Sequence, residues 1–109
     1  MKKICLDLDG VLAQYDGWRG ADAIGEPLDG AKQFVQTLID DGYQVVVHSA
    51  RAPVRVDKWL HDHNFPQDVV VSPRKPPATA YIDDNGIRFN GDFVEVYNQL
   101  KTLTPWWRK

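Results

Sequence analysis

The sequence has one cysteine, no excess of basic residues and no long apolar run, and each shortage excludes a class of protein. Cys5 alone cannot form an intrachain disulfide, so we expect a core-stabilised fold and a reducing, cytoplasmic setting. A formal net charge of -2 provides no basic surface for holding a long nucleic acid by charge. The apolar runs fall far short of the ~20 residues that cross a bilayer, so no membrane partner is expected.

The length and the start of the chain set two further expectations. With 109 residues and no internal repeat, we predict one domain spanning residues 1–109. The first six residues are basic and then apolar, like the start of an export signal. Asp7 interrupts this apolar run, so export is not expected.

Short apolar strands alternate with amphipathic helices along the sequence. A short continuous apolar run is typical of a strand buried on both faces, and a helix shows apolar residues at intervals of three and four. Proline, glycine and capping residues mark the boundaries. This pattern predicts strands over 3–8, 44–48, 69–71 and 79–82, helices between Asp29 and Gly42 and from Pro53 to about His63, and a last helix after Asp92.

Local signals refine these boundaries. Asp29 and Asp92 are predicted N-caps, and Phe93, Val96, Tyr97 and Leu100 give the last helix an apolar side. Glycines and a proline break residues 13–27, which we predict to be a short flap-like loop. Residues 87–89 are predicted to add a short β-segment. Alternation of this kind predicts a three-layer α/β/α, Rossmann-like fold with a mainly parallel sheet and no separate cap domain.

Polar residues follow each predicted strand where it ends. The carboxyl ends of parallel strands lie at one edge of a sheet, where α/β proteins bind ligands. We therefore expect these side chains to meet in one crevice, although more than seventy positions separate the first from the last. They are Asp7 and Asp9 after the first strand, Ser49 after the second, Lys75 after the third, and Asp83 with Asp84 after the fourth.

The pair Asp7 and Asp9 is the most informative feature of the sequence. Two carboxylates at the rim of a buried strand repel each other and lose hydration, so they do not favour folding. A chemical use explains them better. In such a site a divalent cation offsets the charge, one carboxylate attacks an electrophile and the other transfers a proton.

Four motifs in order resemble those of the haloacid dehalogenase superfamily of phosphohydrolases. They are Asp7-Leu8-Asp9-Gly10-Val11, Val46-Val47-His48-Ser49-Ala50-Arg51, Lys75-Pro76 and Tyr81-Ile82-Asp83-Asp84. The resemblance implies a small, capless phosphatase that acts through an aspartyl-phosphate intermediate and uses Mg²⁺. It implies that Asp7 is the nucleophile and that Asp9 is the general acid and base, with its main-chain carbonyl on the metal. It further implies that Ser49 and Lys75 bind the phosphoryl group and that Asp83, supported by Asp84, binds Mg²⁺.

The residues around these motifs are candidates for substrate binding. Gly10 and Ala50 adjoin the motif residues, Arg51 could bind a second anionic group, and Trp18 and Arg19 of the loop could reach over the crevice. The expected partner is a small phosphorylated substrate, with a phosphorylated nucleic-acid end as an alternative.

The aromatic pair Trp106 and Trp107 has three open interpretations. It could support a homo-oligomer, stack on a nucleic acid or pack on the domain itself.

Two other functions stay open from the sequence. A binding module could use the same pocket for a phosphate-bearing ligand or a protein without turnover. A receiver-like signalling domain also combines aspartates, a hydroxyl and a lysine at such an edge. It is disfavoured because a receiver has its acceptor aspartate after a middle strand, whereas acidic residues here follow the first and last strands.

Overall fold

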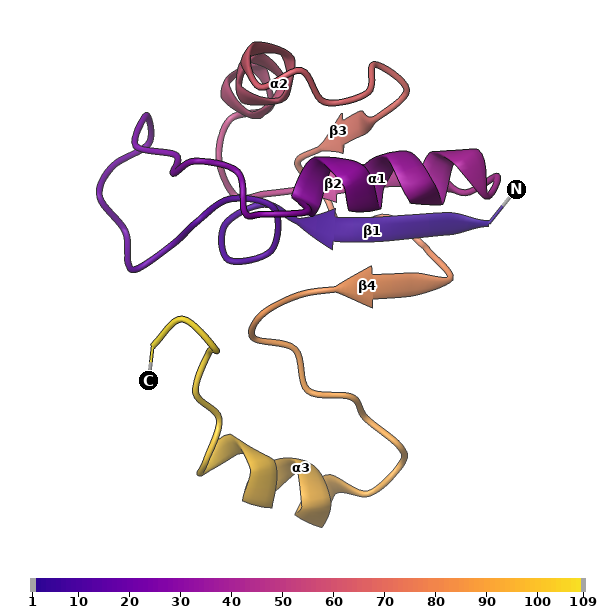
Figure 1. Ribbon diagram of the computed structural model, residues 1–109. Helices are drawn as coiled ribbons and strands as arrows, with labels where there is room; N and C mark the ends of the chain where they lie inside the picture. The colour runs from indigo at the N-terminus through magenta and orange to yellow at the C-terminus, as the bar shows by residue number, and fades with distance from the viewer. Residues whose placement is uncertain (1, 109) are drawn as a thin grey trace.

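Four parallel strands form the sheet at the centre of the computed structural model, which describes residues 2–108 (Figure 1). Their order is β3-β2-β1-β4, so β1 lies inside the sheet and pairs with both β2 and β4. All four carboxyl ends therefore lie at one edge, and the predicted α/β fold with a parallel sheet is confirmed. The strands are β1 (Lys3–Asp7), β2 (Gln44–His48), β3 (Val70–Ser72) and β4 (Ala80–Ile82).

The helices α1 (Ala31–Asp40) and α2 (Pro53–Asp62) build the core against one face of the sheet. Alternate residues of β1 and β2 point to that face, and Leu6 and Val47 among them are fully buried. Val35 of α1 and Val56 of α2 meet them. Burial of each such side chain contributes about 1.5–3 kcal/mol to the free energy of folding. This packing holds in place the strand ends that carry the site.

Ends of β1, β3 and β4 differ from the predicted ones by one residue, and two other local predictions also differ from the structure. Gly30, not Asp29, is the N-cap of α1, and no side chain caps the helix there. The backbone at this position is left-handed, with φ of 85°, a conformation that glycine adopts without strain. Residues 87–89 form no strand, since they leave β4 without running beside another strand. The predicted cap at Asp92 is confirmed, because its Oδ1 accepts hydrogen bonds from the backbone N–H groups of Val94 and Glu95.

The last helix, α3 (Phe93–Leu100), lies beyond β4 and buries none of its residues (Figure 1). Its predicted apolar side exists but is not covered, since Phe93 is 78% exposed and Tyr97 61% exposed. The helical period predicts such a stripe without specifying what it packs against.

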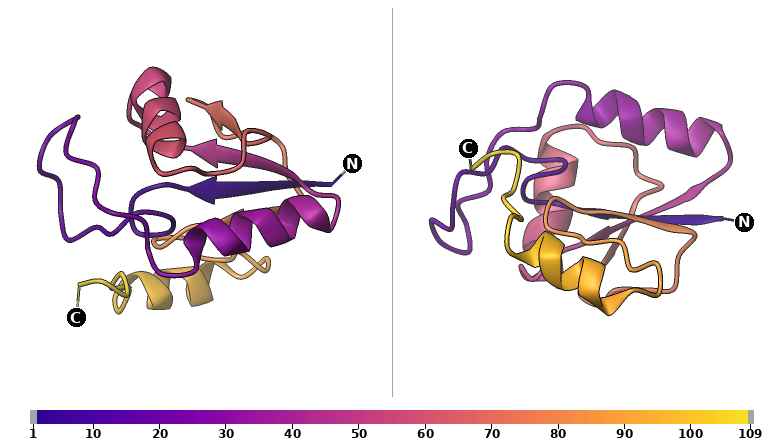
Figure 2. Two further views of the ribbon diagram at one scale, coloured as in Figure 1. Left: turned by 45° about the horizontal axis from the view of Figure 1, so that its top comes forward. Right: turned by 90° about the horizontal axis from the view of Figure 1, so that it is seen from below.

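Residues 13–27 leave β1 as a loop that closes on itself. The N–H of Gln14 donates to the carbonyl of Glu26 over 2.8 Å, and the N–H of Leu28 donates to that of Leu12 over 2.8 Å. The chain after α3 turns back toward this loop (Figure 2). Within residues 2–108, every helix is too short or too polar to cross a bilayer.

Candidate functional site

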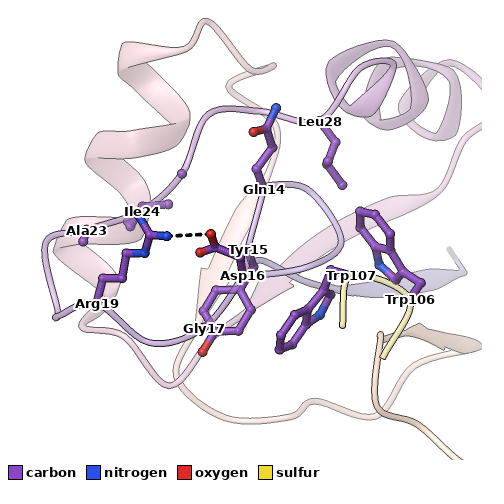
Figure 3. A pocket seen from close by; sticks show the side chains of 11 residues that line it. Gln14, Tyr15, Asp16, Gly17, Arg19, Ala23, Ile24, Leu28, Trp106 and Trp107 are labelled. Atoms are coloured by element: carbon purple, nitrogen blue, oxygen red, sulfur yellow. Dashed lines mark hydrogen bonds and ion pairs between the residues drawn. The ribbon is translucent and has the colours of Figure 1, made fainter. Parts of the chain in front are cut away.

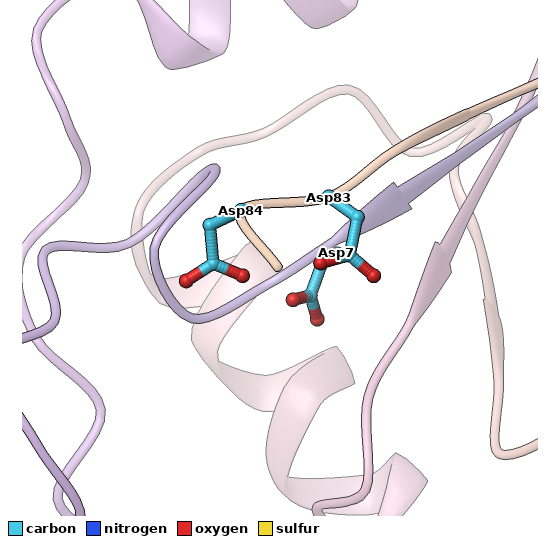
Figure 4. Close-up of side chains that lie close together, drawn as sticks. All are labelled: Asp7, Asp83 and Asp84. Atoms are coloured by element: carbon cyan, nitrogen blue, oxygen red, sulfur yellow. The ribbon is translucent and has the colours of Figure 1, made fainter. Parts of the chain in front are cut away.

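Three carboxylates converge at the carboxyl edge of the sheet (Figure 4). Asp7 ends β1, and Asp83 and Asp84 directly follow β4. Because β1 and β4 pair in parallel, with Leu6 opposite Ile82, the residues that follow each strand emerge side by side. One oxygen from each carboxylate lies within 4.8 Å of the others.

Burial makes the Asp7 carboxylate costly in its ionised form. Loss of hydration, followed by the negative charges of Asp83 and Asp84, raises the pKa of Asp7 from 3.8 to about 7. The backbone N–H of Leu8 donates to Asp7 Oδ1 over 2.9 Å and opposes this rise. Without a cation, then, the fold bears an electrostatic cost at the position that the sequence singles out.

This cost predicts that metal-free protein loses stability as the pH rises. Between pH 4 and pH 7 the unfolded chain releases the Asp7 proton and the folded chain retains it, so raising the pH favours unfolding. A pKa raised from 3.8 to about 7 corresponds to a loss of at most about 4 kcal/mol in the free energy of unfolding. Because Asp7 is partly exposed, we expect a loss of about 1–2 kcal/mol. Urea unfolding in EDTA at pH 5 and pH 8 measures it. The difference in unfolding free energy between pH 5 and pH 8 should be smaller in Asp7→Asn. An equal difference in that variant would contradict the assignment to Asp7.

The three carboxylates suit a hard divalent cation. Mg²⁺ takes oxygen ligands and retains several waters, so two or three carboxylates suffice to hold it. Of the predicted metal residues, Asp7, Asp83 and Asp84 share this cluster, whereas the Asp9 side chain lies outside it. Asp83 is oriented locally, because its Oδ1 accepts the backbone N–H of Asn85 over 2.7 Å.

Asp9 is paired with Arg51, whose side chain is only 1% exposed. Arg51 Nε donates to Asp9 Oδ2 over 2.9 Å and Arg51 Nη2 donates to Oδ1 over 3.2 Å. The same guanidinium donates to the backbone carbonyls of Gly20, Ala21 and Ala23 in the loop. Trp18, 62% exposed, places its ring 4.6 Å from the guanidinium carbon. Arg51 therefore joins the loop to Asp9.

Ser49 and Lys75 occupy the same edge. Ser49 is buried, and its Oγ accepts the backbone N–H of Arg51 over 3.1 Å, while Ala50 between them is exposed. Lys75 Nζ lies 4.3 Å from the ring centre of Tyr81 and lines a small cavity of about 80 Å³ together with Asp7 and Asp83.

His48 is a neighbour of Asp7 that is absent from the site residues predicted from the sequence. It lies opposite Asp7 in the pairing of β1 and β2 and lines the same small cavity. Its Nδ1 is buried, and no group within residues 2–108 hydrogen bonds to it. The parallel register, which puts the last residues of two adjacent strands side by side, could have identified it.

The tail after α3 also reaches the site. Trp106 Nε1 donates to the carbonyl of Gly10 over 2.8 Å, and Trp107 Nε1 donates to Asp84 Oδ2 over 2.5 Å. Gly10 has φ of 83°, and a Cβ there would collide with the Asp84 carboxylate, so only glycine allows this close approach. Both indoles thus pack on the domain, next to the acidic cluster.

Comparison with known proteins supports the fold class. No protein-family model and no curated protein matches the chain at a significant level. Among solved structures, a conserved protein from Bacteroides thetaiotaomicron is similar with a TM-score of 0.61 and 19% identity, covering 96% of this chain and 93% of that one. A protein from Vibrio cholerae gives a TM-score of 0.55 at 21% identity, with coverages of 95% and 100%. A chain of a Pnkp1/Rnl/Hen1 complex gives 0.51 at 15% identity, covering 99% of this chain and 37% of that chain.

Proposed function

We propose that the protein is a Mg²⁺-dependent phosphomonoesterase of the haloacid dehalogenase type with Asp7 as its nucleophile. The observation that carries this proposal is the convergence of Asp7, Asp83 and Asp84 at the carboxyl edge of a parallel sheet. The ordered motifs and the α/β fold support it.

Mg²⁺ fits this acidic cluster, and Asp7 and Asp83 would hold it with Asp84 in support. Its charge would offset the repulsion among the carboxylates and the charge that develops on the phosphoryl oxygens. Lys75 and Ser49, with backbone groups near Gly10 and Ala50, would bind those oxygens.

The reaction proceeds in two displacements. An Asp7 oxygen attacks phosphorus while the bond to the ester oxygen breaks, and the leaving oxygen takes a proton from Asp9. Water then attacks the phosphorus of the aspartyl phosphate and gives a proton to Asp9. Inorganic phosphate leaves and the Asp7 carboxylate is restored.

Arg51 has a different role here from the anion-binding role expected of it. Its donors face Asp9 and the loop carbonyls, so we assign it to positioning Asp9. A carboxylate has about four acceptor positions, so an Asp9 oxygen can still exchange a proton while it accepts from the guanidinium.

Hydrolysis of p-nitrophenyl phosphate tests the function. We expect steady release of p-nitrophenol with MgCl₂ and none with EDTA at matched ionic strength. The same MgCl₂ titration is expected to raise the melting temperature, because a ligand at 100 times its Kd stabilises by about 2.7 kcal/mol. Asp83→Asn should weaken both effects. Stable phosphorylation by a small phosphodonor without turnover would indicate a receiver, and the absence of both reactions would indicate a binding module.

A further inference from the structure

A hollow of about 740 Å³ opens between the 13–27 loop and the C-terminal tail (Figure 3). This volume falls in the range of sites that hold small organic ligands. Tyr15, Trp106 and Trp107 contribute aromatic surface to it, and Gln14, Asp16 and Arg19 contribute polar groups. The Arg19 guanidinium is paired with Asp16 over 2.6 Å at the side opposite the indoles.

The hollow shares a wall with the acidic cluster. Trp107 lines the hollow and at the same time donates to Asp84, and Trp106 lines it while donating to Gly10. Tyr15 meets Trp107 edge to face, with ring centres 4.8 Å apart, which fixes both rings. Trp107 therefore connects the lining of the hollow to the acidic cluster.

We propose that this hollow binds the planar aromatic base of a nucleoside monophosphate whose phosphate lies at the acidic cluster. The proposal rests on the proposed function for the identity of that cluster. Aromatic side chains beside a hollow of this size offer stacking surfaces. Any planar nucleobase can stack on them, because each base has a π-face. Gln14 and Arg19 lie within the same lining and offer hydrogen-bond donors to a base edge.

Binding to Asp7→Asn separates this inference from the catalytic proposal, because it requires no turnover. Isothermal titration in MgCl₂ compares AMP and UMP with ribose 5-phosphate, which has the same phosphate and sugar but no base. We expect each nucleotide to bind about tenfold or more tightly than ribose 5-phosphate, in line with the usual contribution of one stacked base. Equal affinities would overturn the proposal, even if p-nitrophenyl phosphate is hydrolysed.

Variants at Tyr15 locate the binding site. Tyr15→Leu should weaken AMP binding about tenfold and ribose 5-phosphate binding clearly less, because only AMP loses a stacked ring, and Tyr15→Phe should restore AMP binding because it keeps the ring. Trp107→Phe keeps a ring but removes the donor to Asp84, so it should affect both ligands. Equal weakening of AMP and ribose 5-phosphate in Tyr15→Leu would place the base elsewhere and overturn the assignment. Failure of the phosphatase assay with retained base-dependent binding would instead reject catalysis alone.

Discussion

Asp7→Asn is expected to reduce hydrolysis of p-nitrophenyl phosphate by at least ~10³-fold and to raise the melting temperature of metal-free protein at pH 8. The amide cannot act as the attacking oxygen, so the first displacement is lost. The same change removes a charge that burial and Asp83 disfavour, which is why the pKa of Asp7 is raised to about 7. Opposite effects on activity and stability are the signature of a functional charge that costs the fold stability.

Asp57→Asn provides the matched control, since Asp57 is an exposed carboxylate on α2 that belongs neither to the acidic cluster nor to the lining of the small cavity. It should leave turnover and melting temperature nearly unchanged. Steady-state kinetics in MgCl₂ and thermal unfolding in EDTA measure the two effects. If Asp7→Asn lowered the melting temperature in EDTA, Asp7 would be a structural residue and the electrostatic argument would be wrong.

The sheet and the acidic cluster are predictable because both follow from short-range patterns. Apolar runs such as Val45-Val46-Val47 must be buried on both faces, which requires a parallel sheet covered by crossovers. Parallel pairing then brings Asp7 and Asp83 to one edge whatever the length of chain between them. The cluster can therefore be predicted from the order and direction of the strands, without knowledge of side-chain contacts.

The contacts of the long side chains are not predictable in this way. Trp107 reaches Asp84, and Arg51 reaches Asp9 and the loop, through paths that depend on the route of irregular chain. An arginine at the end of a motif suggests an anion-binding residue, because the sequence does not show that backbone carbonyls will use its donors. The exposure of the apolar side of α3 is equally unpredictable, since an apolar stripe indicates a helix but not what the helix packs against.

Arg51→Met is expected to lower kcat by roughly 10–100-fold and to destabilise the protein by about 3 kcal/mol. The variant leaves the largely buried Asp9 carboxylate, 19% exposed, without its partner, and loss of one member of such a pair is costly. It also releases the loop carbonyls of Gly20, Ala21 and Ala23. A displaced Asp9 delivers its proton less efficiently, which accounts for the loss of rate. Urea unfolding and kcat at saturating substrate, corrected for the folded fraction, measure the two effects.

The nature of the leaving group distinguishes positioning of Asp9 from a purely structural role. p-Nitrophenolate leaves without much help from an acid, whereas an alkoxide needs a proton as the bond to phosphorus breaks. The loss of kcat in Arg51→Met should therefore be larger for an alkyl phosphate than for p-nitrophenyl phosphate. Arg51→Lys keeps the charge without the two-pronged geometry, so it should recover part of the stability but little of this rate. The double variant Asp9→Asn/Arg51→Met should lose less free energy of unfolding than the sum of the losses in the two single variants, because it leaves no charge unpaired. Equal rate losses for both leaving groups would show that Arg51 supports only the fold.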